Sequence, residues 1–233
     1  MNSMTYSERR QFLQSYFDRT AVDAWKRLTS DAPVSRIRAT VRAGRNAMRA
    51  QLLDWLPADL AGTRLLDAGC GTGALAYEAA RRGAEVIAVD VSASLIDIAC
   101  ERMPSDLPDG MVDFRVGDML DADFGDVDHA VAMDSLIHYD TADIVAALAR
   151  LARRTSGSIL FTIAPRTPAL TAMHLAGRVF PRGDRAPAII PVGENDLRRR
   201  VAAQPGLAGW KIARTARVLT GFYKSQAFEL VRA

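Results

Sequence analysis

The chain has 233 residues, which is enough for one α/β domain with an accessory segment, since domains commonly run to about 100 to 200 residues. Apolar residues make up 49% and charged residues 24%, a composition that argues against a disordered or membrane-spanning chain. The net charge is +3, and arginines concentrate before residue 50 and between 166 and 200. Such arginine-rich segments can attract carboxylates, phosphates or anionic membranes. The ordinary interpretation of a run of charged residues is, however, a solvent-exposed surface.

The two cysteines and the N-terminal sequence indicate the cellular compartment and argue against a zinc site. Cys70 and Cys100 form no C-x-x-C pair and have no histidine-rich partner segment, so neither a disulfide framework nor a zinc site is predicted. The first residues are charged where a signal peptide needs an apolar run, and no apolar run approaches the ~18 residues of a spanning helix. We therefore expect a cytoplasmic protein.

The N-terminal region is expected to be helical. Apolar residues recur at helical spacing from Ser7 to Leu28, which predicts one or two amphipathic helices, and a further helix is predicted over 34–56, ending before Pro57. Residues 1–60 are interpreted as a helical cap or lid over a ligand crevice. Fixed packing against the core and contact with a membrane surface are the alternatives.

Short apolar runs that alternate with helices follow this cap, a pattern typical of a doubly wound parallel sheet. A terminal antiparallel hairpin is predicted over 210–231, with its turn at Thr220 and Gly221. The core is assigned to 61–165 and 204–233, and the proline-interrupted segment 166–203 is interpreted as an inserted substrate-binding arm. The expected strands are 64–68, 85–89, 112–116, 128–133 and 158–163, and the expected helices are 75–82, 93–102, 141–154 (with Thr141 as N-cap), 170–179 and 196–203.

A glycine-rich turn between the first strand and its helix carries the ligand chemistry. The string runs Asp67-Ala68-Gly69-Cys70-Gly71-Thr72-Gly73. Glycine permits the tight turn and lets the backbone approach a ligand that a Cβ would repel. The free amides of the helix N-terminus favour a carboxylate or phosphate, while Asp67 offers an acceptor to an ammonium group or an ordered water.

A dinucleotide-binding loop is a serious rival interpretation. Gly69, Gly71 and Ala74 satisfy G-x-G-x-x-A, and Asp90 ends the second strand, so an NAD(P)-dependent oxidoreductase stays open. Three features favour a methyl-donor site: the acid ahead of the first glycine, the sequence Gly117-Asp118-Met119 after the third strand, and the predicted antiparallel hairpin at the C-terminus. Together they resemble class I S-adenosylmethionine-dependent methyltransferases, which implies a Rossmann-like, seven-stranded sheet with the last strand antiparallel.

The resemblance to class I methyltransferases also implies which residues hold S-adenosylmethionine (SAM) and its product S-adenosylhomocysteine (SAH). The methionine portion is assigned to Asp67, Gly69, Gly71 and Gly73 of the turn, and the ribose hydroxyls are assigned to Asp90 at the end of the second strand. The adenine is assigned to residues after the second, third and fourth strands: Val91, Asp118, Met119, Met133 and Asp134. Asp118 is expected to accept a hydrogen bond from the adenine amino group.

The segment 133–139 follows the fourth strand, and the carboxyl ends of strands in such sheets face the ligand crevice. No Asn-Pro-Pro-Tyr motif of the kind that methylates a flipped base or an amide occurs, so a nucleic-acid substrate is not expected. Motifs spread over nearly the whole chain resemble the magnesium-protoporphyrin O-methyltransferase family. They are Tyr16-Phe17-Asp18, Val41-Arg42-x-Gly44, the glycine turn, Leu136-Ile137-His138-Tyr139, Ala164-Pro165, Phe180-Pro181 and Phe222-Tyr223.

The resemblance to this family implies esterification of one propionate of magnesium protoporphyrin IX, a porphyrin dicarboxylate of chlorophyll and bacteriochlorophyll synthesis. The segment after Trp25 lacks the tyrosine of oxygenic relatives, which favours the bacteriochlorophyll branch. A propionate is ionised near neutrality, so positioning should dominate catalysis. His138 is expected to orient the carboxylate or take its proton, with Tyr16 as a second candidate.

The arginine-rich flanks would pair with propionates, and Arg42 and Arg185 are the candidate substrate-binding cations. No metal site is expected. A magnesium chelatase subunit is a candidate partner, and the inner or photosynthetic membrane is a candidate contact surface. Methylation of another small acid or of a quinone-type phenol is the alternative within the methyltransferases.

Overall fold

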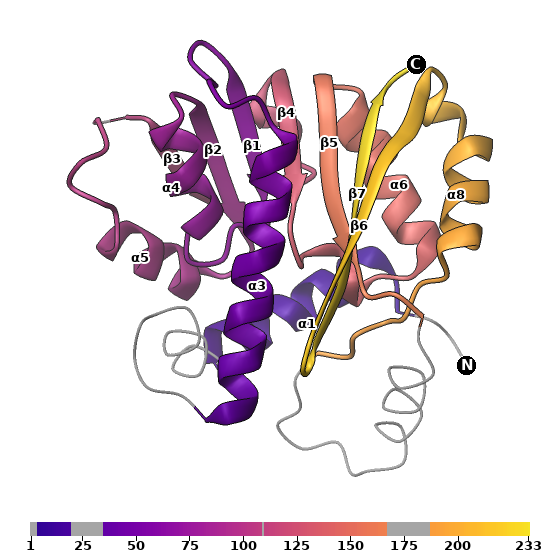
Figure 1. Cartoon of the computed structure of the whole chain (residues 1–233), viewed down its shortest axis with the longest axis horizontal. Helices are drawn as coiled ribbons and strands as arrows, with labels where there is room; N and C mark the ends of the chain where they lie inside the picture. The colour runs from indigo at the N-terminus through magenta and orange to yellow at the C-terminus, as the bar shows by residue number, and fades with distance from the viewer. Residues whose placement is uncertain (1–3, 20–34, 109, 167–186) are drawn as a thin grey trace.

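A computed structural model describes residues 4–19, 35–108, 110–166 and 187–233. Within these residues the core is a seven-stranded sheet of order β3-β2-β1-β4-β5-β7-β6 (Figure 1). Every strand pair is parallel except those of β7, which runs antiparallel to both neighbours. The predicted class I fold is confirmed. The strands are β1 (Arg64–Ala68), β2 (Glu85–Asp90), β3 (Val112–Val116), β4 (Val127–Ala132), β5 (Thr155–Ile163), β6 (Trp210–Thr220) and β7 (Tyr223–Arg232).

Helices cover both faces of the sheet, so its central strands consist of nearly continuous apolar residues. Helices α3 (Arg36–Trp55) and α4 (Ala74–Arg81) pack on one face. Helices α6 (Thr141–Ala152) and α8 (Glu194–Ala203) pack on the other, and α5 (Ala93–Glu101) lies against β2 and β3 (Figure 1). The apolar stripe of α3 buries Met48, Leu52 and Leu53 against the sheet, as its periodicity predicts.

Local predictions need correction at α6, β5 and the hairpin. Helix α6 ends at Ala152, not at 154, and β5 begins at Thr155, not at 158. The N-cap of α6 is Asp140, not Thr141, because the Asp140 carboxylate accepts from the amides of Ala142 and Asp143 at 2.9 and 3.0 Å. Strand β6 continues through Thr220, so the hairpin turns at Gly221 and Phe222; the φ of +53° at Gly221 suits glycine. The helix expected over 170–179 and the end of that expected over 7–28 lie outside the described residues.

Helix α1 (Tyr6–Arg19) lies across the carboxyl ends of the parallel strands (Figure 1). Its Tyr6 hydroxyl donates to Asp118 after β3 at 2.7 Å, and its Asp18 accepts from the Ser92 hydroxyl after β2 at 2.6 Å. Its own Leu13 side chain is buried. The first helix therefore covers the edge of the sheet at which a ligand crevice is expected.

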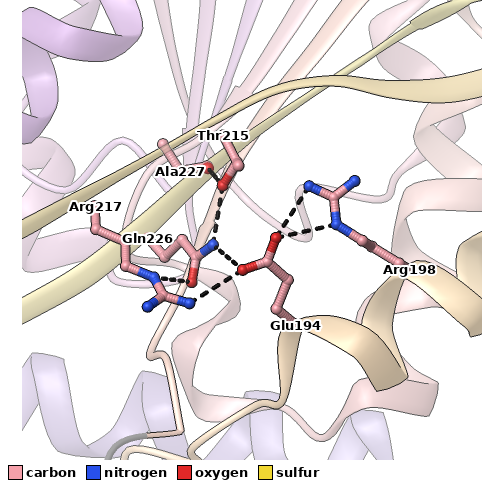
Figure 2. Close-up of polar contacts among 6 residues, drawn as sticks. All are labelled: Glu194, Arg198, Thr215, Arg217, Gln226 and Ala227. Carbon is pink, nitrogen blue, oxygen red and sulfur yellow. Dashed lines mark hydrogen bonds and ion pairs between the residues drawn. The ribbon is translucent and has the colours of Figure 1, made fainter.

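The start of α8 is anchored to the last two strands by a polar cluster (Figure 2). The Glu194 carboxylate accepts from Gln226 at 2.8 Å, from Arg217 at 3.1 Å and from Arg198 at 3.0 Å. Gln226 is buried. This cluster holds the chain that enters α8 beside the carboxyl end of β5, where Val192 forms a bridge with Pro165.

No helix among the described segments has the length and apolar character needed to cross a bilayer.

Candidate active site

A cavity of about 380 Å³ opens at the carboxyl ends of the parallel strands. It is enclosed by α1, α3, the turn after β1, the loops after β2, β3 and β4, and the start of β7. Ligands of doubly wound sheets bind at this edge. Nine predicted site residues line the cavity: Tyr16, Gly69, Gly71, Asp90, Val91, Met119, Met133, Asp134 and His138.

The glycine turn is shaped by two close approaches. A Cβ on Gly69 would lie 2.4 Å from the Cβ of Ser135, so the loop after β4 can pack here only against glycine. Gly69 and Gly71 both have positive φ, at 86° and 56°. Gly73 is the N-cap of α4 and is not a cavity residue; a Cβ there would lie 2.8 Å from the ring of Tyr77. Gly69 and Gly71 therefore line the cavity at the start of the turn, while Gly73 allows close packing against Tyr77 at its end.

Asp90 couples the ends of β1 and β2. Its carboxylate accepts from the Gly71 amide at 2.9 Å and from the Ser92 amide at 3.0 Å. Burial raises the pKa of Asp90, and the amide bonds oppose this shift. An ionised carboxylate has about four acceptor positions, so capacity for the two ribose hydroxyls is left. The arrangement fits the role predicted for Asp90.

Asp67 lies behind the turn and is almost fully buried. Its Oδ2 has no hydrogen-bond partner within the described part of the chain. Burial, and then the charge of Asp90, raise the pKa of Asp67 to about 7, while an amide bond from Ala76 acts in the opposite direction. A buried acceptor without a donor calls for one from a ligand or water. Asp67 is not among the cavity residues, so its direct bond to the ammonium group of SAM stays a prediction. The glycine turn and Asp90, which do line the cavity, fit this cofactor.

The raised pKa of Asp67 predicts that SAH binding depends on pH. A bound ammonium group favours the ionised carboxylate, so binding releases a proton wherever Asp67 is protonated in the free enzyme. We expect the Kd of SAH to be roughly tenfold weaker at pH 6 than at pH 8, since one pH unit below a pKa costs about tenfold. Calorimetry in buffers of different ionisation enthalpy would measure the released proton.

Asp67→Asn is the control for this pH dependence, because it keeps the shape of the side chain and removes its titration. The variant should bind SAH more weakly but with a flatter pH profile. Equal slopes for the wild type and the variant would assign the proton to another group. In the apo protein the protonated carboxyl favours the folded state, so the contribution of Asp67 to stability falls as pH rises from about 4 towards 7.

Apolar side chains form the walls beside this turn. Val91, Met119 and Met133 line the cavity with Leu95, as expected of an adenine site. Asp118 is placed differently: its carboxylate accepts from Tyr6 and from the Leu120 amide, pairs with Arg10 at 3.4 Å, and is not among the cavity residues. Asp118 therefore fastens α1 over the site, and its bond to the adenine amino group stays a prediction.

His138 ends a short 3₁₀ helix (Leu136–His138) after β4. Its Nδ1 lies 3.2 Å from the carbonyl oxygen of Ala188. Because a carbonyl only accepts, Nδ1 carries the proton and the neutral ring presents Nε2 as an acceptor. Burial lowers the pKa of His138, against the opposing effects of the Ala188 carbonyl and Asp134, so the neutral form is favoured. Tyr16 lines the same cavity from α1.

The cavity-facing side of α3 differs from the predicted one. Arg38, Val41 and Arg45 line the cavity, because positions three and four apart share one face of a helix. Arg42 is not among the cavity residues. Arg185 lies outside the described residues, so the structure describes no contact for it. The cations that α3 brings to this cavity are Arg38 and Arg45.

Comparison with known proteins decides the family. Residues 132–232 match the family model "Magnesium-protoporphyrin IX methyltransferase C-terminus", and residues 65–156 match a methyltransferase domain model. The chain is 49% identical over 225 residues to the magnesium-protoporphyrin O-methyltransferase of Rhodobacter capsulatus, covering 96% of this chain and 97% of the relative. This chain belongs to the magnesium-protoporphyrin O-methyltransferase family.

Structural similarity agrees with this family membership. A crystal structure of magnesium protoporphyrin IX methyltransferase from Synechocystis with bound SAH matches with a TM-score of 0.84 at 30% identity, over 97% of this chain and 100% of that chain. A ubiquinone biosynthesis O-methyltransferase from Xanthomonas oryzae is 34% identical over 194 residues, 78% of this chain and 77% of the relative. The class I fold and SAM as cofactor are confirmed. No cluster of three candidate metal ligands occurs among the described residues.

Two roles in this site were not predicted from the sequence. Ser135 lines the cavity beside Gly69, and its buried Oγ has no hydrogen-bond partner in the described ranges. Asp134, expected beside the adenine, also forms a hub: its carboxylate binds Arg45 of α3 at 2.9 Å and the Tyr223 hydroxyl of β7 at 2.9 Å. The φ of +55° at Asp134 is uncommon for a residue other than glycine. No local pattern in the sequence marks either role.

Proposed function

We propose that this chain transfers the methyl group of SAM to one propionate of magnesium protoporphyrin IX, yielding the monomethyl ester and SAH. Family membership over nearly the whole chain supports the reaction. The structural observation that carries it is that His138 lines the same cavity as the glycine turn and Asp90. A substrate carboxylate and the methyl donor can therefore meet in one enclosed site.

Catalysis in this site is mainly positioning. When bound, SAM supplies an electrophilic methyl group to the carboxylate oxygen and departs as SAH. Gly69, Gly71 and Asp90 hold the cofactor, and α1 covers the cavity and excludes water. Holding the two reactants at a near-attack separation of about 3 Å replaces a bimolecular encounter. The side chains around this cavity need not form a covalent intermediate.

His138 is suited to keep the substrate ionised. An apolar cavity raises the pKa of a carboxylic acid, so a fraction of the propionate enters protonated. The neutral imidazole offers Nε2 to accept that proton, while Nδ1 stays bonded to Ala188. The methyl ester product carries no proton on this oxygen, and the proton can pass from Nε2 to solvent when the site opens. His138 thus acts as an orienting group and base.

His138→Ala is expected to lower kcat by about 100-fold, the lower end of the usual contribution of a positioned base. The Kd of SAH should change less than about twofold, because the cofactor residues are untouched. In the wild type, kcat should fall as pH drops through the lowered pKa of His138, and this acid limb should be absent in the variant.

His129→Gln is the matched control for His138, because His129 lies in β4 away from the cavity and bonds Ser158 at 2.9 Å. The His129→Gln variant should have the kcat of the wild type at temperatures below its own unfolding transition. Equal losses of cofactor affinity and turnover in His138→Ala would contradict the assigned role.

Incubation with SAM and magnesium protoporphyrin IX tests the function directly. Mass spectrometry should show a gain of one methyl group and formation of SAH. Absence of any porphyrin product would overturn the proposal, and methylation of a quinone-type phenol in its place would establish the alternative. Binding of NAD(P)H with no binding of SAH would indicate an oxidoreductase.

We further propose that this enzyme is cytoplasmic and contacts the membrane peripherally. Ile37, Leu219 and Phe222 are 53%, 57% and 59% exposed, and Arg36 precedes Ile37 in the sequence. Co-sedimentation with vesicles containing anionic lipid, lost in Phe222→Ser, would support the contact. The magnesium-inserting chelatase is proposed as a partner, because insertion must precede methylation of a magnesium porphyrin; co-elution of the two would test it.

A further inference from the structure

Two cations line the cavity without an assigned task. Arg38 comes from α3 and Lys224 from β7. Within the described residues neither side chain has an ion-pair or hydrogen-bond partner, whereas Arg45 is engaged by Asp134. A cation that lines a ligand cavity and lacks a protein anion is available to an anionic ligand.

Arg38 and Lys224 belong to one junction between α3 and the β6–β7 hairpin. The Phe222 amide donates to the Thr40 hydroxyl at 3.4 Å, which joins the hairpin turn to the first turns of α3. A little further along, Gly44 lies directly against Tyr223: a Cβ there would be 2.4 Å from the ring. Arg38 lies two residues before Thr40, Lys224 follows Tyr223, and both side chains line the cavity.

The junction lies beside the loop that follows β4. The Tyr223 hydroxyl at the start of β7 donates to the carboxylate of Asp134, in that loop, at 2.9 Å. His138 follows β4. On the opposite side of β4 the cavity is lined by the cofactor residues, including Asp90, which would repel a carboxylate.

Magnesium protoporphyrin carries two propionates on neighbouring rings at one edge of the macrocycle. When one propionate lies at His138, the other must therefore lie beside it. We propose that Arg38 and Lys224 bind the propionate that is not methylated. This inference rests on the proposed function and adds the determinant that selects a dicarboxylate.

Binding of the second propionate also accounts for single methylation. To be methylated again, the monoester would have to turn over and place its neutral ester against Arg38 and Lys224. Both cations would then lack a counter-ion in a partly apolar cavity, an arrangement that costs affinity. The same two side chains thus favour the diacid and disfavour the diester product.

The test compares three substrates on three full-length enzymes. The substrates are magnesium protoporphyrin IX and its two monomethyl ester isomers, each with one free propionate. The wild type should show a kcat/KM for the diacid at least about 30-fold above that for either monoester, since charge-assisted bonds contribute this much. In R38Q/K224M this ratio should fall to about 1, through a higher KM for the diacid.

R36Q/K211M is the matched control, because it removes the same charge from exposed positions that do not line the cavity. It should keep the wild-type ratio, and all three enzymes should bind SAH equally. An unchanged preference in R38Q/K224M would overturn the inference. A wild type inactive on every porphyrin would overturn the proposed function instead; absorbance titration of the diacid and the monoesters would then decide whether Arg38 and Lys224 form the site.

Discussion

Asp90→Ala is expected to weaken SAH binding by at least about 100-fold. Two ribose hydroxyls would lose their charged acceptor, and a hydrogen bond to a charged group contributes about 1.5 to 3 kcal/mol. The substitution also removes the acceptor of the Gly71 amide, which helps to shape the glycine turn. Calorimetric titration with SAH measures the loss, and the turnover at saturating SAM should fall much less than the affinity.

Asp97→Ala is the control for Asp90, because Asp97 is an exposed carboxylate in the neighbouring helix α5. It should bind SAH as the wild type does. Thermal unfolding of both variants separates a local effect from a loss of fold. If Asp90→Ala bound SAH within about threefold of the wild type, the ribose assignment would be wrong.

Asp134→Ala is expected to lower the free energy of unfolding by about 3 to 5 kcal/mol, the usual cost of removing one partner from a buried ion pair. The Asp134 side chain is only 5% exposed. Burial and the charge of Asp134 raise the pKa of Tyr223, so this hydroxyl stays protonated and donates to the carboxylate. The groups that lose their acceptor are Arg45, Tyr223, Ser225 and Thr162.

Urea unfolding of matched variants tests this hub. Asp113→Ala breaks an ion pair with Arg115 whose side chains are 49% and 39% exposed, and it should cost less than about 1 kcal/mol. Asp134→Gly removes the carboxylate but suits the positive φ of this position. If Asp134→Gly were as stable as the wild type, backbone strain rather than the polar hub would dominate.

The local sequence pattern was sufficient to predict most strands of the sheet. The bounds of β1 and β3 are those expected from apolar runs that end at glycine or at a charged turn. Helix caps were harder to predict, because Asp140 and Thr141 are both good capping residues. Only the backbone conformation, which is extended at Asp140, decides between them. The segment around Arg185 lies outside the described residues, and its binding role stays a prediction.

By itself, the sequence determined the sheet class, the glycine turn and the family, since strand periodicity and glycine spacing are local properties of the chain. Only the tertiary structure decided which charged side chains face the cavity. Asp118 is bonded to Tyr6 and Asp134 to Tyr223, although each pair is far apart in sequence, and Arg38 and Lys224 both line the cavity. Such contacts arise from how α1, α3 and the hairpin pack on the sheet. The glycine turn marks where the cofactor binds, and long-range packing supplies the groups proposed to select its substrate.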